Sequence, residues 1–118
     1  MRLTAITLDC PDPVRLAEFH RRATGWAPHP ASGSAFAALG GEDGPVLGFQ
    51  RVEDHRAPQW PGQGVPQQMH LDFAVPDLDE VEERLLALGA ARPEPQPDAA
   101  RFRVLLDPAG HPLCLTRR

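Results

Sequence analysis

The stretch 71-LDFAVPDLDEVEER-84 repeats an earlier part of the chain, 6-ITLDCPDPVRLAEF-19. The two stretches are offset by 65 residues, and in each an apolar run leads through Pro-Asp into a more polar segment. Further along, 44-GPVLGF-49 resembles 110-GHPLCL-115 at an offset of 66 residues. Self-similarity of this kind indicates two copies of one supersecondary unit.

Each copy predicts an apolar strand followed by a helix. The strands are expected at Leu3–Leu8 and Met69–Val75. The first helix begins after Asp12, whose carboxylate can accept hydrogen bonds from the free N–H groups of the first turn. In the second copy Asp77 or Asp79 has this capping role. The second helix then presents one apolar stripe, with steps of three and four residues, and ends at a glycine: Leu78, Val81, Leu85, Leu88 and Gly89.

Three short extended runs are expected after each helix, separated by the turn sequences 40-GGEDGP-45 and 107-DPAGHP-112. Pro-x-Pro in the first run of each copy suggests an edge-like or irregular strand. The six runs are Trp26–Ser32, Ser34–Leu39 and Val46–Val52, then Arg92–Pro97, Phe102–Asp107 and Pro112–Thr116.

These elements predict an α+β fold made of two βαβββ units. One unit is too small to bury a stable core alone, so both should share one curved mixed sheet in a single domain, 1–118. The first unit spans residues 1–52 and the second 68–118. Residues 53–67, rich in Pro, Gly and Gln, form the connector between them.

Composition argues against several partners. The net charge is −4 and the isoelectric point about 5.7, and the twelve basic residues, all arginine, are scattered; we therefore expect no nucleic-acid partner. No apolar stretch approaches the length of a membrane helix, and the N-terminus lacks the apolar core of a signal peptide. We expect a cytoplasmic protein in which Cys10 and Cys114 are free thiols.

The stretches 66-PQQMHLDFAVPDLDEV-81 and 103-RVLLDPAGHPLCL-115 resemble the vicinal oxygen chelate superfamily, which includes glyoxalase I, bleomycin-resistance proteins and extradiol dioxygenases. More narrowly, the whole chain is similar to small glyoxalase-like domain proteins common in actinobacteria. The resemblance implies that the two units form a cup. It also implies a homodimer, because homodimers are common in this superfamily.

In metal-dependent members, four histidine or glutamate ligands line the floor of the cup. Carried onto this chain one at a time, the four positions are Ala5, Gly48, His70 and Cys114. A stable divalent site normally needs three or more protein ligands, so the resemblance implies no ordinary glyoxalase I activity. Any metal here would bind His70.

His70 and Asp72 are expected on one face of a strand, where the imidazole serves as a general base, as a ligand anchor or only as a polar strand residue. Cys114 is a nucleophile, a soft metal ligand or an unreactive buried residue. Trp60, in the connector, either covers the cup or fills a gap between the halves. The predicted ligand-binding residues are Ala5, Thr7, Gly48, Gln50, Trp60, His70, Asp72 and Cys114.

We therefore expect a protein that binds a small organic molecule in its cup without a cofactor. Glycine and alanine at two former ligand positions leave room for that molecule, and the acidic balance suits a neutral or cationic compound. The alternative is a divergent metal-dependent lyase, isomerase or dioxygenase, which completes a divalent site around His70 with Gln50, Asp72 or a residue of a second chain. A third alternative is a closed domain that only binds a partner.

Overall fold

The computed structural model describes residues 1–30, 32–40 and 43–118 and contains two compact units. Unit 1 is Met1–His55 and unit 2 is Arg56–Arg118. Most of the predicted connector, 53–67, therefore belongs to unit 2. That the two units make up one domain stays a prediction.

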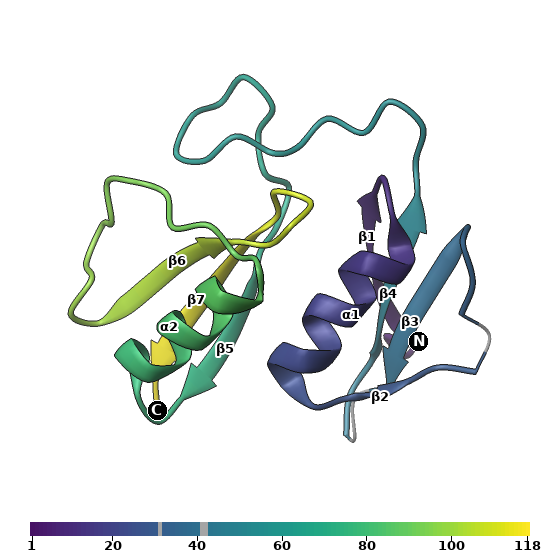
Figure 1. Cartoon of the computed structure of the whole chain (residues 1–118), viewed down its shortest axis with the longest axis horizontal. Coiled ribbons are helices and arrows are strands. Elements are labelled where there is room, and N and C mark those ends of the chain that lie inside the picture. The colour runs from purple at the N-terminus through teal and green to yellow at the C-terminus, as the bar shows by residue number, and fades with distance from the viewer. Residues whose placement is uncertain (31, 41–42) are drawn as a thin grey trace. The chain divides into compact units, whose positions relative to one another are not determined.

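Unit 1 has the predicted βαβββ order (Figure 1). Its sheet has the strand order β1-β4-β3-β2, in which β1 and β4 are parallel and the other pairs antiparallel. Helix α1 packs against β3 and β4. The elements are β1 (Ala5–Cys10), α1 (Pro13–Thr24), β2 (Ala27–Pro28), β3 (Phe36–Gly40) and β4 (Val46–Arg51).

The run predicted at Trp26–Ser32 forms only the two-residue strand β2. The chain instead forms a turn at Ser32, whose N–H donates to the carbonyl of His29 at 3.2 Å. Ala31 of this run lies outside the described residues, as do residues 41 and 42 of the turn predicted at 40–45.

Unit 2 has the order βαββ, one strand fewer than predicted. In its sheet, β7 is central: it is parallel to β5 and antiparallel to β6. Helix α2 packs against β6 and β7, and Figure 1 shows it lying across one face of the sheet. The elements are β5 (Leu71–Val75), α2 (Leu78–Leu88), β6 (Phe102–Leu106) and β7 (Pro112–Arg117).

The prediction of a strand at Arg92–Pro97 is wrong. Three of its six residues are prolines, which have no N–H to donate to a neighbouring strand. The side chain of Gln96 takes the place of a strand: its carbonyl accepts from the N–H of Val104 and its amide donates to the Val104 carbonyl, both at 2.9 Å. Only an isolated bridge between Ala91 and Leu106 extends the β6 edge further.

The α+β class with mixed sheets is confirmed, whereas hydrogen bonds do not join the strands into one shared sheet. They form a four-stranded sheet in unit 1 and a three-stranded sheet in unit 2. The two sheets repeat one register. Shifted by the offsets found in the sequence, the pair Thr7–Gly48 of β1 and β4 becomes the pair Asp72–Cys114 of β5 and β7.

The helices begin and end at the predicted kinds of residue. Asp12 caps α1 and Asp77 caps α2, each carboxylate accepting from the N–H three residues later, at 3.1 and 3.0 Å. Gly25 and Gly89 end the two helices in the left-handed conformation, which glycine adopts without strain. Of the two capping candidates for α2, Asp77 is the cap, and Asp79 binds Arg103.

A charged cluster holds α2 against β6. Arg103 of β6 donates to Asp79 and to Glu82, both at 2.7 Å. Arg92 lies 3.1 Å from the second oxygen of Glu82. The side chains of Arg103 and Glu82 are only 13% and 9% exposed, so this pair is shielded from solvent and orients the face of β6 that carries Arg103 toward the helix.

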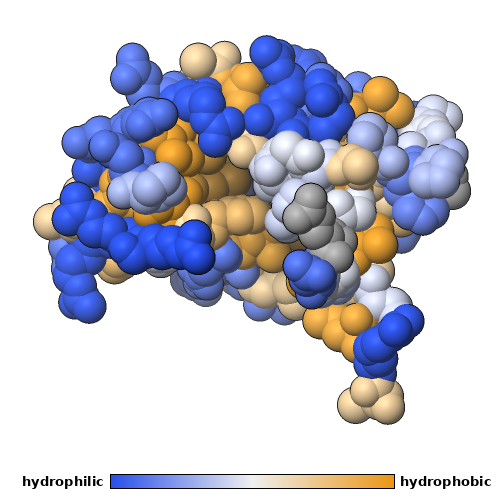
Figure 2. All heavy atoms as spheres, turned by 90° about the horizontal axis from the view of Figure 1, so that it is seen from below, coloured by the Kyte–Doolittle hydropathy of each residue, from blue (hydrophilic) through white to orange (hydrophobic). Residues whose placement is uncertain are grey.

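Much of the surface that Figure 2 shows is hydrophilic, with apolar residues exposed in places between hydrophilic ones. Six large apolar side chains are exposed among the described residues: Met1, Leu3, Val14, Phe36, Met69 and Leu86. In the described part of the chain, no helix has the length and hydropathy to cross a bilayer.

Replacing Gln96 by leucine should lower the free energy of unfolding by about 2 kcal/mol, because the N–H and C=O of Val104 lose their hydrogen-bond partners. Leucine has about the volume of glutamine, so the substitution leaves little empty space. Urea denaturation monitored by circular dichroism measures this change. The control is Gln63→Leu on the exposed connector, which should change stability by less than about 0.5 kcal/mol. Equal effects of the two substitutions would show that the Gln96 bonds do not stabilise β6.

Candidate functional site

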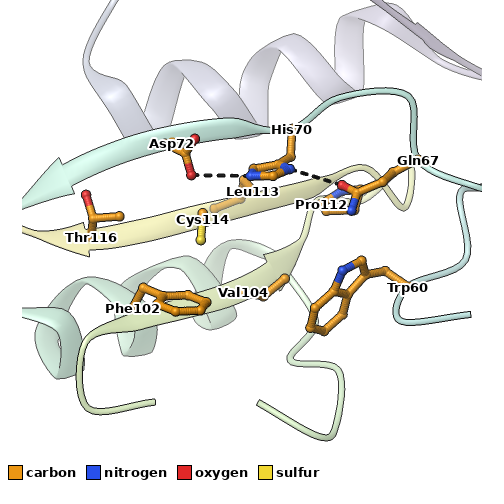
Figure 3. Close-up of a pocket in the computed structure, with 10 residues that line it drawn as sticks. All are labelled: Trp60, Gln67, His70, Asp72, Phe102, Val104, Pro112, Leu113, Cys114 and Thr116. Atoms are coloured by element: carbon orange, nitrogen blue, oxygen red, sulfur yellow. Dashed lines mark hydrogen bonds and ion pairs between the residues drawn. The ribbon is translucent and has the colours of Figure 1, made fainter. Parts of the chain in front are cut away.

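Unit 2 contains a cavity of about 370 Å³. This volume lies within the range of small-molecule sites, roughly 300–1,000 Å³. Ten residues line it, all of them in unit 2 (Figure 3): Trp60, Gln67, His70, Asp72, Phe102, Val104, Pro112, Leu113, Cys114 and Thr116.

The register of the sheet places the residues around Cys114. In the ladder, Cys114 of the central strand β7 lies between Asp72 of β5 and Val104 of β6. Phe102 and Thr116 are paired two residues further along. Because side chains alternate along a strand, these residues share one face of the sheet.

The two sides of the cavity differ in chemistry. Figure 3 shows the polar side chains of Gln67, His70 and Asp72 along one side, and Phe102 and Val104 across from them. The arrangement can hold an organic molecule by apolar contact on one side and by hydrogen bonds on the other.

His70 lies one residue before β5, not within the strand as predicted. Its Nε2 lies 3.5 Å from Oδ1 of Asp72, and its Nδ1 lies 3.2 Å from Oε1 of Gln67. Both ring nitrogens thus face protein oxygens, whereas a general base needs one nitrogen directed at its substrate. The geometry favours His70 as a positioned polar group at the cavity edge.

The thiol of Cys114 is not activated. Burial, the negative charge of Asp72 and a hydrogen bond with that carboxylate together raise its pKa to about 11, with burial as the largest cause. A nucleophilic cysteine or a metal thiolate needs a lowered pKa, so at neutral pH Cys114 is a protonated, unreactive thiol. Neither Cys10 nor Cys114 forms a disulfide, as predicted, and both side chains are buried.

Trp60 reaches the cavity from the part of the connector that belongs to unit 2. The N–H of Gln59 donates to the carbonyl of Val65 at 2.7 Å and closes the loop that carries Trp60. Before this loop, Ala57 packs against Gly110, where a Cβ would lie 2.6 Å from that of Ala57. Trp60 therefore lines the cavity, and its contact with a ligand stays a prediction.

The other four predicted ligand-binding residues, Ala5, Thr7, Gly48 and Gln50, lie on β1 and β4 of unit 1. Gly48 does not leave the open space that the sequence suggested. A Cβ there would lie 2.9 Å from the ring of Phe36 and 3.0 Å from Oγ1 of Thr7, so these side chains already fill the space.

Six lining residues were missed by the sequence analysis: Gln67, Phe102, Val104, Pro112, Leu113 and Thr116. Pro112 and Thr116 could have been predicted, because residues two positions before and after Cys114 on a strand share its face. Phe102 and Val104 required the β6–β7 register, which local sequence does not contain.

Few side chains that could bind a metal ion lie in the cavity. Among residues 1–30, 32–40 and 43–118, no group of three or more His, Cys, Asp or Glu side chains could hold an ion. Within the cavity, the imidazole of His70 and the carboxylate of Asp72 are accompanied by a protonated thiol, which is a poor ligand.

Comparison with known proteins supports the fold assignment. A family model described as "Glyoxalase-like domain" matches residues 5–116. A possible glyoxalase from Bacillus cereus is 23% identical over 98% of this chain and 98% of its own, with a TM-score of 0.72. A glyoxalase/bleomycin resistance protein/dioxygenase family enzyme from Burkholderia phytofirmans PsJN is 16% identical over 99% and 98%, with a TM-score of 0.78.

A bleomycin-binding protein from bleomycin-producing Streptomyces verticillus, solved with copper(II)-bleomycin, is also similar. It is 19% identical over 100% of this chain and 97% of its own, with a TM-score of 0.61. At these identities the likeness is one of fold, and it confirms the predicted fold family. No curated protein matches the chain in sequence.

Replacing Asp72 by asparagine should lower the pKa of Cys114, because it removes the negative charge that disfavours the thiolate. The pKa should stay above its ordinary value, since burial is the larger cause. At pH 9 we expect iodoacetamide to alkylate Cys114 about fivefold faster than in the wild type. Peptide mass mapping follows the two cysteines separately.

The control for this experiment is Glu83→Gln on the exposed part of α2, which changes the net charge equally and should leave the alkylation rate unchanged. An unchanged rate in Asp72→Asn would show that the carboxylate does not act on the thiol.

Replacing Gly48 by valine should destabilise the protein by about 2 kcal/mol, because the new side chain overlaps the ring of Phe36. Gly40→Val is the matched control, since no atom of the described residues beyond its chain neighbours lies within 4 Å of a Cβ at Gly40. In a Phe36→Ala background the cost of Gly48→Val should fall. Urea denaturation measures the free energy of unfolding of each variant. A cost of Gly48→Val that is the same in both backgrounds would contradict the proposed overlap.

Proposed function

Because the chain belongs to the glyoxalase-like domain family, we propose that it binds a small organic molecule in the cavity of unit 2 without the four-ligand metal site of the metal-dependent members. The observation that carries this proposal is the pairing of an apolar side with a polar side around a space of about 370 Å³.

The chemistry of the lining residues supports binding over catalysis. Cys114 is held as a neutral thiol, and both nitrogens of His70 face protein oxygens. Binding needs only pre-positioned groups of this kind, whereas catalysis needs a group whose proton or electron pair is directed at the substrate. The similar protein from Streptomyces verticillus, solved with copper(II)-bleomycin, is a precedent for ligand binding on this fold.

A second candidate function is a divergent lyase, isomerase or dioxygenase. The observation that favours it is the 3.5 Å approach of His70 to Asp72 at the edge of the cavity. In this version a divalent ion is bound by His70 together with Asp72 as a non-standard ligand, or with a residue of a second chain in a homodimer.

Elemental analysis of native protein, purified without chelators or a polyhistidine tag, separates the two functions. For the binding protein we expect far less than one metal ion per chain in both the wild type and His70→Ala. Near-stoichiometric metal that disappears in His70→Ala would overturn the metal-free proposal and favour the enzyme.

Ligand binding itself is tested with a library of small aromatic compounds, observed in proton–nitrogen correlation spectra. Binding compounds should shift the amide signals of β6 and β7. Thr116→Trp should abolish these shifts by filling the cavity, whereas Thr4→Trp at the exposed N-terminus should not. Shifts that persist in Thr116→Trp would place the site elsewhere.

A further inference from the structure

We infer that the ligand is uncharged or cationic and presents a hydrogen-bond donor to Asp72, and that carboxylates and phosphates are excluded. This inference rests on the proposed function and specifies the chemical class of the ligand. It is carried by the distribution of charge around the cavity.

Asp72 is the only carboxylate among the ten lining residues, and none of the twelve arginines lines the cavity. The carboxylate has only acceptor atoms, and its side chain is 57% exposed, so a ligand can reach it. Its one basic neighbour in the cavity is His70. A protonated amine or amidine would find an acceptor of opposite charge there.

Arg103 and Arg117 are adjacent in sequence to lining residues and are directed away from the cavity. Arg103 lies between Phe102 and Val104 on β6, so its side chain is on the opposite face of the strand. There its guanidinium donates to Asp79 and Glu82. Arg117 follows Thr116 on β7 and is directed away by the same alternation.

An anionic ligand would therefore lose hydration without gaining an arginine, and the ring nitrogens of His70, the one basic lining residue, already face Asp72 and Gln67. The Trp60 indole N–H and the Gln67 amide can donate to a ligand, but both groups are neutral. The hydroxyl of Thr116 already donates to the carbonyl of Phe73, at 3.4 Å. An anion would also lie close to the charge of Asp72, which makes its binding less favourable still.

Three probes that share one ring system test this inference: 1-naphthylmethylamine as the cation, 1-naphthalenemethanol as the neutral compound and 1-naphthoic acid as the anion. Dissociation constants are measured by calorimetry at pH 7, where the amine and the acid are both charged. We expect the amine to bind about fivefold more tightly than the alcohol, and the acid at least about fivefold more weakly.

In Asp72→Asn the advantage of the amine over the alcohol should disappear. Glu83→Gln, which removes the same charge far from the lining residues, should keep the wild-type order. The order of the three probes on the wild type decides the question even if a variant does not fold.

Equal or tighter binding of the acid would overturn the inference and leave the proposed function standing. An amine preference that survives in Asp72→Asn would overturn the role of this carboxylate alone. If no probe binds the wild type, the proposed binding function itself is contradicted, and the ligand class with it.

Discussion

The parallel pairing of β5 with β7 is the constraint on which the site depends. Two parallel strands cannot be joined by a tight hairpin, so the chain between them forms helix α2 and strand β6 before it returns as the central strand. The register of this pairing sets Asp72 opposite Cys114. It thereby sets the negative charge of Asp72 beside the thiol, where it adds to the effect of burial in raising the pKa of Cys114. The pairing of β6 with β7 then sets Val104 on the other side of Cys114.

Unit 1 is built by the same constraint and has a different surface. Its parallel pair β1–β4 sets Thr7 opposite Gly48, the positions that correspond to Asp72 and Cys114. Because the glycine has no side chain, the ring of Phe36 lies over it and fills the space. One backbone arrangement thus carries a cavity with an apolar and a polar side in one copy and an aromatic ring over the corresponding glycine in the other. The difference comes from a few side chains on equivalent strands.

Much of the fold could be predicted because its determinants are local. Both helices begin after an aspartate cap and end at a glycine, as their sequences indicate. A strand was predicted at Arg92–Pro97 because the spacing of its prolines matches the other copy. The prediction was wrong because these prolines lack the N–H groups that a strand needs. The side chain of Gln96 forms hydrogen bonds with the backbone of Val104 instead. No local sequence pattern predicts this interaction.

By itself, the sequence determined the repeated unit and the α+β class, since these depend on periodicity, caps and turns that neighbouring residues encode, and its resemblance to known proteins indicated the family. It also singled out His70, Asp72, Cys114 and Trp60, which the structure brings to one cavity. Only the tertiary structure decided that Phe102 and Val104 complete that cavity, that Gly48 is covered, and that Cys114 keeps its proton. These properties depend on strand register and burial, which arise when residues far apart in the chain come together.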